Sequence, residues 1–571
     1  MKRLICFLII INLIFLSGCS YFVADKTDNE PTVNNENKDD KDYEKNPPVE
    51  DTEDDPIEDP EKNPEDNQGD NNNTENNPDD TGNKPENKPT QVSGSIGDYI
   101  TDLIDTEYCI DKDFIQFLAN LDNRQAKNIV YVSNNGEGDG SYDDPMSLMD
   151  AIDSAKAGQT IYLRGGEYIF TESIWISASG TKDNYITIKS YPGEKAVLTT
   201  TPENVSKYDE DGEYIFFGID EGCSYIIFED LEIHGATDEN VAAFVCYDGG
   251  QNHLIFINND IHDLSTTYLE GGANAFLFMG EKKKSINNIA LIGNRCHDLT
   301  LGYSEAVSFA GNCEYCYVIS NEVYDNTNIG IDFYGNAGYC STKSLDQARY
   351  CVAAYNTVYN CNSPYADCAG IYVDGGRNCL IEGNLIYNCQ YGIEIGSEEK
   401  KDDYPVTDII VRNNVMKNNT VCAMRLGGYD TKSSGTVKNT KVYNNSFINN
   451  GGGYDIILSK ADNISFANNI FVGKNEFVET EFSISYISNL HFYNNYFDGV
   501  GSSITLYGES MSMDALNSRY GGGNTATDIS VRDDFGINKK ISGSAEFTSK
   551  YDFYLVLREE NQIGAVEFSG E

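Results

Sequence analysis

Three carboxylic acids occupy comparable places in three short segments of this chain. The acids are Asp332, Asp374 and Glu394, and the segments are GIDFYG (330–335), GIYVDG (370–375) and GIEIGS (392–397). Each segment has apolar residues at its second and fourth positions, which is the period-two pattern of a β-strand. Two carboxyl groups held roughly 5–9 Å apart on a rigid surface suit glycoside hydrolysis, in which one acid protonates the leaving oxygen and the other attacks or activates water.

Aligning these segments with three similar ones predicts which side chains face inward and which face outward. The similar segments are AFLFMG (275–280), AVSFAG (306–311) and AMRLGG (423–428). Because alternate residues of a strand face opposite sides, the apolar positions form the inward columns. The predicted outward columns are Ser308, Asp332, Tyr372, Glu394 and Arg425, and then Ala310, Tyr334, Asp374, Gly396 and Gly427.

This outward face is the predicted site of chemistry on a saccharide. Clustered like charges raise the pKa of one carboxyl and so create an acid, while tyrosine rings offer flat faces to sugar rings. Two insertions, 336–350 and 363–368, add loops at one edge of the scaffold, where sites are commonly built. We expect the catalytic residues to be Asp374, Asp367 and Asp332, and the substrate-binding residues to be Glu394, Tyr372, Tyr334, Arg425 and Arg377. This interpretation needs no cofactor.

A repeated asparagine identifies the scaffold that positions these strands. Each of nine asparagines is followed two residues later by an apolar residue or cysteine, at intervals of 24 to 35 residues; they are Asn259, Asn294, Asn321, Asn356, Asn384, Asn413, Asn445, Asn469 and Asn495. Such a period is typical of a solenoid with one coil per repeat. No helical-period stretch follows the strand-like segments. The predicted fold is therefore all-β, a single-stranded right-handed parallel β-helix over residues 128–571.

The N-terminal part predicts export and attachment to a membrane. Residues 1–19 (MKRLICFLIIINLIFLSGC) have the basic start and apolar run of a secretory signal, and the ending resembles a bacterial lipoprotein box, which implies a lipid on Cys19. Residues 20–97 are acidic and nearly devoid of apolar side chains, as in a disordered stalk. We expect a monomer on the extracellular face of the cell envelope. The formal net charge of −50 argues against nucleic acid as a partner.

A helical segment, the cysteines and two histidines allow three further predictions. Residues 98–127 have mixed helical spacing and are predicted to form a short helical cap over the first coil. Most cysteines fall in register with the asparagines, which favours thiols stacked in the interior. Cys313-x-x-Cys316 is not predicted to be a zinc site, because no second pair of matching spacing follows. Disulfide bonds remain an alternative for an exported protein. His262 and His297 share the turn position of Tyr324, Tyr359 and Tyr387, so we interpret them as a stacked column rather than as bases.

Two stretches resemble known carbohydrate-active families. The segment YVSNNGEGDGSYDDPMSLMDAIDSAKAGQTIYLRGGEY (131–168), followed by YITIKSYPGEKAVL (185–198), resembles the opening coils of pectate-lyase-like β-helix enzymes, including polysaccharide lyase family 9, and residues 550–565 are similar to their closing strand. The segment YADCAGIYVDGG (365–376) resembles glycoside hydrolase family 136, the lacto-N-biosidases. That resemblance implies that Asp374 and Asp367 share the acid and nucleophile roles, although here only 98–126 stands where those enzymes have a sizeable helical domain.

Three functions follow from these observations. The first is a lipid-anchored glycoside hydrolase that cleaves an oligo- or polysaccharide. The second is a calcium-dependent lyase for an acidic polysaccharide, in which Asp332, Asp374 and Glu394 would hold Ca²⁺ and Arg425 or Arg377 would act as the base, because the outward columns contain no lysine. The third is a non-catalytic adhesin or carbohydrate-binding β-helix on the cell surface.

Overall fold

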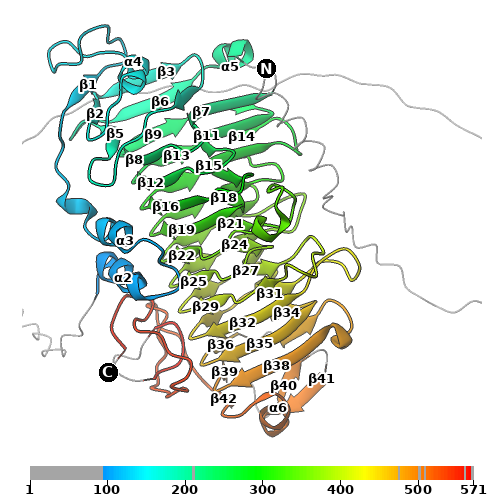
Figure 1. The fold of residues 1–571 in the computed structure, drawn as a ribbon. Helices are drawn as coiled ribbons and strands as arrows, with labels where there is room; N and C mark the ends of the chain where they lie inside the picture. The colour runs from blue at the N-terminus through cyan, green and yellow to red at the C-terminus, as the bar shows by residue number, and fades with distance from the viewer. Residues whose placement is uncertain are drawn as a thin grey trace, which may run out of the picture. The chain divides into compact units, whose positions relative to one another are not determined.

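Each coil of this chain contributes one strand to each of three long sheets (Figure 1). The computed structural model describes residues 94–208, 212–473, 476–498, 503–506, 509–558 and 561–566. We name the sheets 1, 2 and 3 in the order in which a coil enters them. Neighbouring coils pair in parallel, as in β12 with β16 and β24 with β27. The predicted parallel β-helix is confirmed.

Along most of the chain the strands enter sheets 1, 2 and 3 in rotation, although the first two strands both belong to sheet 1 and the closing antiparallel pair to sheet 3. Sheet 1 contains β1 (Val130–Val132), β2 (Thr160–Leu163), β5 (Ile186–Ser190), β8 (Ser224–Glu229), β12 (Asn252–Ile257), β16 (Ile286–Ile292), β19 (Cys313–Ile319), β22 (Val352–Ala354), β25 (Leu380–Glu382), β29 (Ile410–Arg412), β32 (Val437–Tyr443), β35 (Ala461–Ala467) and β38 (Ile487–Tyr493), with β28 (Val406–Thr407) beside β32. Sheet 2 contains β3 (Gly166–Phe170), β6 (Ala196–Thr200), β9 (Leu231–His234), β13 (Asp260–His262), β17 (Arg295–His297), β20 (Glu322–Tyr324), β23 (Thr357–Tyr359), β26 (Leu385–Tyr387), β30 (Val415–Lys417), β33 (Ser446–Ile448), β36 (Ile470–Val472), β39 (Tyr496–Asp498) and β42 (Thr525–Thr527). Sheet 3 contains β4 (Ile174–Ile176), β7 (Glu213–Ile219), β11 (Asn240–Cys246), β15 (Gly272–Gly280), β18 (Glu305–Gly311), β21 (Ile329–Tyr334), β24 (Ala369–Asp374), β27 (Tyr391–Gly396), β31 (Cys422–Gly427), β34 (Tyr454–Leu458), β37 (Glu476–Thr480), β40 (Ser503–Leu506) and β41 (Glu509–Ser512). A separate pair joins β10 (Thr237–Asp238) to β14 (Ser265–Thr266).

A continuous asparagine ladder fills the turn between sheets 1 and 2. The Oδ1 atom of each ladder residue accepts from both the backbone N–H and the side-chain amide of the preceding one, as Asn356 does for Asn321 at 2.9 and 3.0 Å. One predicted member is wrong: the ladder passes through Asn414, not Asn413. Asn413 instead takes the left-handed turn conformation, with φ of 57°. Asn524 extends the ladder by one coil.

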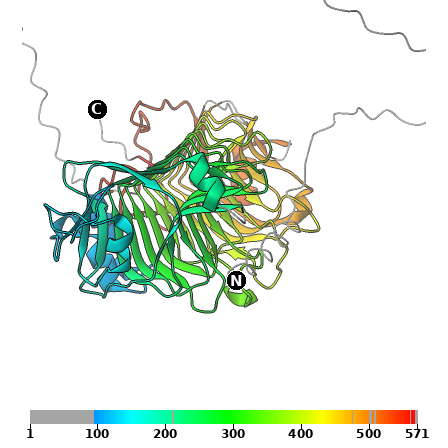
Figure 2. The same cartoon turned by 90° about the horizontal axis from the view of Figure 1, so that it is seen from above.

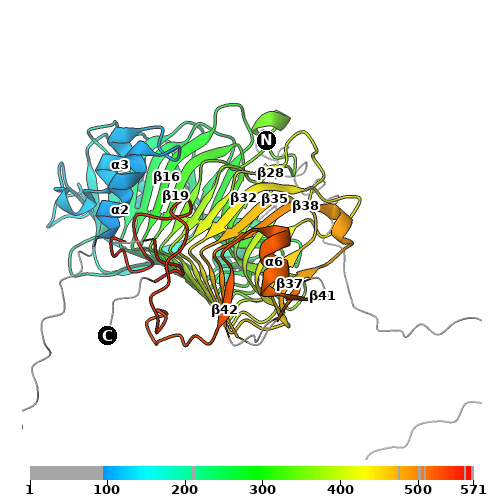
Figure 3. The ribbon, with the colours of Figure 1, turned by 90° about the horizontal axis from the view of Figure 1, so that it is seen from below.

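The ends of the coils are closed by helices other than those predicted within 98–127. The first coil is closed by α4 (Leu148–Asp153), whose Leu148, Ala151 and Ile152 join the main core. The last coils are covered by α6 (Met513–Tyr520), through the buried Leu516 (Figure 3). The helices predicted within 98–127 do form, together with 3-10 turns; these elements are α2 (Ile96–Asp102), η1 (Leu103–Asp105), α3 (Lys112–Leu118) and η2 (Leu121–Asn123). The remaining helical elements are α5 (Pro202–Tyr208), η3 (Lys343–Leu345) and η4 (Ile484–Tyr486).

Helices α2 and α3 pack on the outer face of sheet 1 instead of capping the first coil. Their apolar residues Tyr99, Ile115 and Leu118 share one core with Ile255 and Leu380, which belong to coils far along the stack. In Figure 2 the blue N-terminal segment accordingly lies at one side of the coils. Sheet 1 exposes an apolar outer surface in these coils, and the amphipathic helices bury it.

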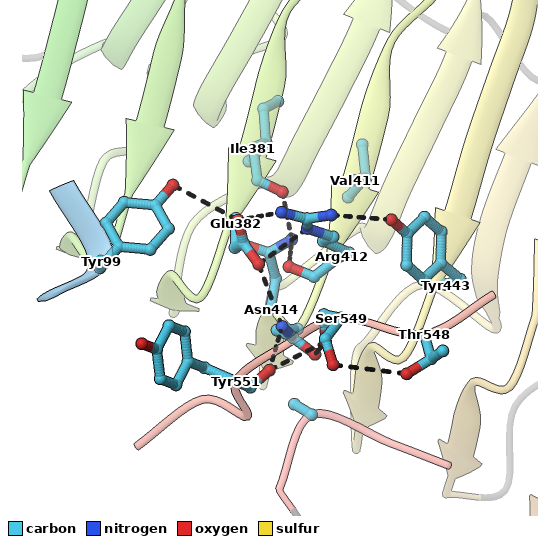
Figure 4. Close-up of polar contacts among 12 residues, drawn as sticks. Tyr99, Ile381, Glu382, Val411, Arg412, Asn414, Tyr443, Thr548, Ser549 and Tyr551 are labelled. Atoms are coloured by element: carbon cyan, nitrogen blue, oxygen red, sulfur yellow. Dashed lines mark hydrogen bonds and ion pairs between the residues drawn. The ribbon is translucent and has the colours of Figure 1, made fainter. Parts of the chain in front are cut away.

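The C-terminal tail joins these helices on sheet 1 around a buried ion pair (Figure 4). The Arg412 guanidinium donates to both Glu382 carboxylate oxygens at 2.7 Å, and the Tyr99 hydroxyl donates to the same carboxylate at 3.3 Å. Asn413 donates to the Tyr551 carbonyl at 2.8 Å. One cluster thus connects the helical segment, the sheet and the tail.

Breaking this ion pair should destabilise the fold. In the Arg412→Met variant the nearly inaccessible Glu382 carboxylate loses its bidentate partner. We expect a loss of about 2–3 kcal/mol in the free energy of unfolding, measured by urea denaturation. The double variant Glu382→Gln/Arg412→Met should recover part of that loss, because no unpaired buried charge remains. A single variant as stable as the wild type would contradict the assigned role.

The thirteen cysteines among the described residues are all free thiols, and twelve of them are buried. Cys316, Cys351 and Cys379 pack in the main core, as the inward-thiol interpretation predicts. The signal peptide, Cys19 and most of the predicted linker lie outside the described residues. Within the described residues, no helix combines the length and apolarity needed to cross a membrane.

Candidate active site

The outward columns of sheet 3 have the register that the alignment predicted, except that Tyr334 bridges Gly375 instead of pairing with Asp374. Ser308 pairs with Asp332, Asp332 with Tyr372, Tyr372 with Glu394, and Glu394 with Arg425. In the second column Asp374 pairs with Gly396 and Gly396 with Gly427. The alternate residues of the same strands, such as Ile331 and Val373, lie in the main core. The acids therefore lie on the outer side of three consecutive coils.

These acids are nevertheless buried, because flanking segments cover the outer face. Asp332, Asp374 and Glu394 are 2%, 3% and 5% exposed. The Asp374 backbone N–H approaches Asp332 Oδ1 at 3.4 Å, and the Glu398 N–H donates to Asp374 Oδ1 at 3.0 Å. Glu398 belongs to the loop that follows β27. The exposed carboxylate surface that we expected is therefore an acidic site beneath loops.

Burial raises the pKa of every acid in this group, and neighbouring negative charges raise it further. Burial raises the pKa of Asp332 well above its usual range, and the negative charges of Glu305 and Asp374 raise it further. Burial and Glu398 do the same for the pKa of Asp374. Burial also raises the pKa of Glu305 to about 7, and that of Glu398 to about 7. The four carboxyls, which we call the acidic cluster, therefore hold protons at neutral pH that isolated acids would lose.

Arg425 organises a second group of acids beside the cluster. Its Nη1 donates to Glu394 at 3.1 Å, and its Nη2 donates to both carboxylate oxygens of Glu481 at 3.0 and 2.8 Å. Asp367 lies 3.8 Å from the same guanidinium. Burial raises the pKa of Glu394 to about 7, although the Arg425 charge opposes this increase. Asp367 thus lies with Arg425 and Glu394, and its side chain is 66% exposed.

The tyrosines offer less surface to a sugar ring than we expected. Tyr372 and Tyr391 are each only 5% exposed. The Tyr372 hydroxyl lies across Gly396, where an added Cβ would come within 2.4 Å of it. The Tyr391 ring faces Arg425, whose guanidinium carbon is 5.5 Å from the ring centroid. Tyr334 is partly exposed and packs edge-on against Tyr339, with ring centroids 5.5 Å apart.

Arg377 is the one predicted site residue that lies away from these groups. Arg377 follows Asp374 around the turn to sheet 1. There its backbone forms isolated β-bridges with Arg349 and Thr407 of the neighbouring coils. Its guanidinium lies 6.0 Å from the Tyr350 ring centroid. The structure therefore brings Asp332, Asp374, Glu394, Arg425 and Asp367 to one face, and separates Arg377 from them.

Sequence reasoning missed Glu305, Glu398 and Glu481. Glu398 continues the outward alternation of β27 two residues beyond Gly396, so a longer alignment would have found it. Glu305 has the parity of the inward residues Val307 and Phe309, but it is the first residue of β18 and is partly exposed. Glu481 follows β37 and reaches Arg425 from two coils away, which no local pattern indicates.

Parallel coils that stack through three long sheets define a parallel β-helix. A family model described as "Pel9A-like, right handed beta helix region" matches residues 130–469. The chain belongs to this Pel9A-like family of right-handed β-helices. The predicted pectate-lyase-like resemblance is confirmed.

Individual relatives differ in how much of the chain they match. The Uncharacterized protein YwoF of Bacillus subtilis (strain 168) is 32% identical over 373 residues, which cover 62% of this chain and 78% of that protein. Pectate lyase PEL9 of Emericella nidulans is 36% identical over 112 residues, covering 18% and 27% of the two chains. Among solved structures, the GH136 lacto-N-biosidase from Eubacterium ramulus superposes with a TM-score of 0.41 at 12% identity, covering 73% of this chain and 70% of that one.

Proposed function

We propose that this protein is a glycoside hydrolase that cleaves an oligo- or polysaccharide at the acidic cluster of sheet 3. The observation that carries the proposal is the side-by-side placement of Asp332 and Asp374, both buried and both with raised pKa. Such a pair supplies a proton donor and a carboxylate base at the same pH. Glu305 and Glu398, which are partly exposed, are the members that a substrate meets first.

The chemistry follows from the coupling of these carboxyls. Two neighbouring acids that repel one another share a proton, so one is neutral while the other is ionised. The neutral acid protonates the glycosidic oxygen as the bond breaks, and the ionised acid attacks the anomeric carbon or accepts a proton from water. Asp332 and Asp374 divide these two roles. Arg425, which neutralises Glu394, keeps a further negative charge from accumulating beside the reacting sugar.

A lyase is the second candidate, and the family supports it. The chain belongs to a family named after a pectate lyase, and part of it is similar to another one. A calcium ion held by the sheet 3 acids fits the structure poorly. Among the described residues, the group of three whose ligand atoms all lie within 4.8 Å of one another is Glu232, Asp260 and His262, on sheet 2. Arg425, which would be the base, is already bound to two carboxylates.

The products of cleavage distinguish the two candidates. The soluble part, residues 94–571, would be incubated with neutral and uronate-containing glycans. A hydrolase releases a new reducing end without unsaturation, whereas a lyase releases an unsaturated sugar that absorbs in the ultraviolet. Cleavage that Asp374→Asn abolishes, with no ultraviolet-absorbing product, supports the proposal. An unsaturated product from a uronate polymer would replace it with the lyase.

The acidic cluster also predicts the pH dependence of cleavage. The Glu398 charge raises the pKa of Asp374, so the Glu398→Gln variant should lower that pKa. The alkaline limb of the kcat/KM profile, where the catalytic acid loses its proton, should then move to lower pH. An Asp402→Asn variant, which removes an exposed acid of the same loop, is the control. An unmoved alkaline limb in Glu398→Gln would argue against coupling between these carboxyls.

We place this enzyme on the outer face of a bacterial envelope, held by a lipid on Cys19. The support is the apolar leader that ends in Leu16-Ser17-Gly18-Cys19, followed by the acidic stretch 20–97. The Cys19→Ala variant should lose incorporation of a fatty-acid label and leave the membrane fraction. If the Cys19→Ala variant still incorporated the fatty-acid label and stayed in the membrane fraction, Cys19 would not be the site of the lipid anchor.

A further inference from the structure

A second constellation of ionisable groups lies on sheet 2, remote in sequence from the acidic cluster. Glu232 belongs to β9, Asp260 and His262 belong to β13, and His297 belongs to β17. Asp260 pairs in register with Glu232, and His262 with His297. Residues two apart on a strand face the same side, so the parallel stacking brings all four side chains to one outer surface. Oxygen or nitrogen atoms of Glu232, Asp260 and His262 lie within 4.8 Å of one another.

Each of the two histidines lies between two carboxylates. His262 Nδ1 is 2.6 Å from Asp263 and its Nε2 is 3.4 Å from Glu232 Oε1. His297 Nδ1 is 2.7 Å from Asp298 and its Nε2 is 3.0 Å from Asp260 Oδ1. A neutral imidazole has one N–H donor only. When Nδ1 uses it, the Nε2 lone pair faces a carboxylate oxygen, and this contact is repulsive unless Nε2 carries a proton or both atoms bind one cation.

We propose that a divalent transition-metal ion of the zinc class binds here, through Glu232, Asp260 and the Nε2 atom of His262, with water completing its coordination, while His297 holds Asp260 from the next coil. Mixed imidazole and carboxylate donors suit such an ion. Two donors on a tetrahedral ion with bonds of about 2.1 Å lie roughly 3.4 Å apart, which matches the His262–Glu232 contact. The ion joins two successive coils, those of β9 and β13, and serves to staple them.

The residues around these donors are arranged as metal sites require. Asp263 and Asp298 each follow their histidine in the left-handed conformation, with φ of 52° and 55°, and hold its Nδ1. A carboxylate on the far ring nitrogen fixes the orientation of a metal-bound imidazole and raises its basicity. The three donor side chains are between 13% and 23% exposed, so an ion can enter from solvent.

Two cationic side chains form ion pairs with the carboxylate donors Glu232 and Asp260. Lys195 contacts Glu232, and Arg295 binds Asp260 at 3.1 Å and Glu322 at 3.4 Å. A bound metal would compete with both. The Lys195→Met variant should therefore bind the ion more tightly than the wild type, because one competitor for Glu232 is gone.

Zinc titration of the chelator-treated protein tests this proposal. Residues 94–571 would be titrated with Zn²⁺ at neutral pH by isothermal calorimetry, with thermal unfolding recorded in parallel. We expect one saturable site and a rise in Tm with zinc. The His262→Asn variant should lose the binding and the rise in Tm, whereas His297→Asn, which removes a side chain that holds Asp260, should weaken binding about tenfold. His491→Asn, which removes a histidine on sheet 1, should bind zinc as the wild type does.

Cobalt provides a readout independent of stability. Co²⁺ in a site with imidazole and carboxylate donors gives visible absorption, which should appear in the wild type and in His491→Asn but not in His262→Asn. Absence of zinc and cobalt binding in the wild type would overturn the proposal and leave the histidines as imidazolium partners of the acids. Binding that persists in His262→Asn/His297→Asn would overturn it as well, because the ion would then lie elsewhere.

Discussion

Replacing Asp374 by Asn is expected to lower saccharide cleavage about 10²–10⁴-fold, the contribution typical of a positioned acid or base. Asparagine keeps the size of the side chain and the acceptor for the Glu398 N–H, which binds Asp374 Oδ1 at 3.0 Å. It cannot ionise or donate a proton to a glycosidic oxygen. The loss should therefore fall on kcat, whereas KM changes little, and Asp332→Asn should behave in the same way.

The same substitution should stabilise the protein above neutral pH. The raised pKa of Asp374 means that the folded state retains a proton that the unfolded chain loses. Wild-type stability accordingly falls as pH rises from the ordinary carboxyl pKa toward the folded value. The Asp374→Asn variant lacks that dependence, because its side chain does not titrate. Its Tm should exceed that of the wild type at mildly alkaline pH, and the difference should shrink as the pH falls toward the ordinary carboxyl pKa.

The control is another buried acid outside the site. Asp455 is 1% exposed, and burial raises its pKa to about 7. Asp455→Asn should share the stabilisation at mildly alkaline pH but keep full activity. If Asp374→Asn lost both activity and stability at every pH, the carboxylate would have a structural role and the proposed chemistry would fail. Normal turnover in Asp374→Asn would reject it directly.

The sequence specified the repeating part of this molecule well, because strand alternation is a local property. Two apolar positions per segment were enough to place Asp332, Tyr372, Glu394 and Arg425 in one column. The alternation of apolar and polar residues along a strand does not predict which segments cover the outer face of the sheet. The loop that brings Glu398 onto Asp374, and the distant coil that brings Glu481 to Arg425, depend on tertiary packing. The predicted open carboxylate surface was therefore wrong in its exposure.

The helical segment shows a second limit of local patterns. Amphipathic spacing in 98–127 correctly indicated short helices, but it contains no information about which apolar surface they bury. An apolar outer face on sheet 1, formed by residues such as Ile255 and Leu380, takes up α2 and α3. The first coil is closed by α4 instead, whose residues lie within the segment that resembled opening coils.

Replacing Asn356 by Ala should be among the most destabilising single changes in this fold. Its Oδ1 accepts from the Asn321 backbone N–H and side-chain amide, at 2.9 and 3.0 Å. Its Nδ2 donates to Val318 O and to Asn384 Oδ1, at 2.9 and 3.0 Å. Alanine deletes all four bonds in a turn that water does not reach. At about 1–3 kcal/mol for each buried group left unsatisfied, the free energy of unfolding should fall by about 3–5 kcal/mol.

The position of the ladder in the coil makes this prediction specific. Asn123→Ala, at an exposed site in η2, removes the same side chain and should cost less than about 0.5 kcal/mol. Urea denaturation of both variants gives the comparison. Because each ladder amide bonds its neighbours, the loss should extend to adjoining coils, and hydrogen exchange should increase in β20 and β26 as well as in β23. Equal stability of the two variants would mean that coil packing alone, without the asparagines, holds the turn between sheets 1 and 2.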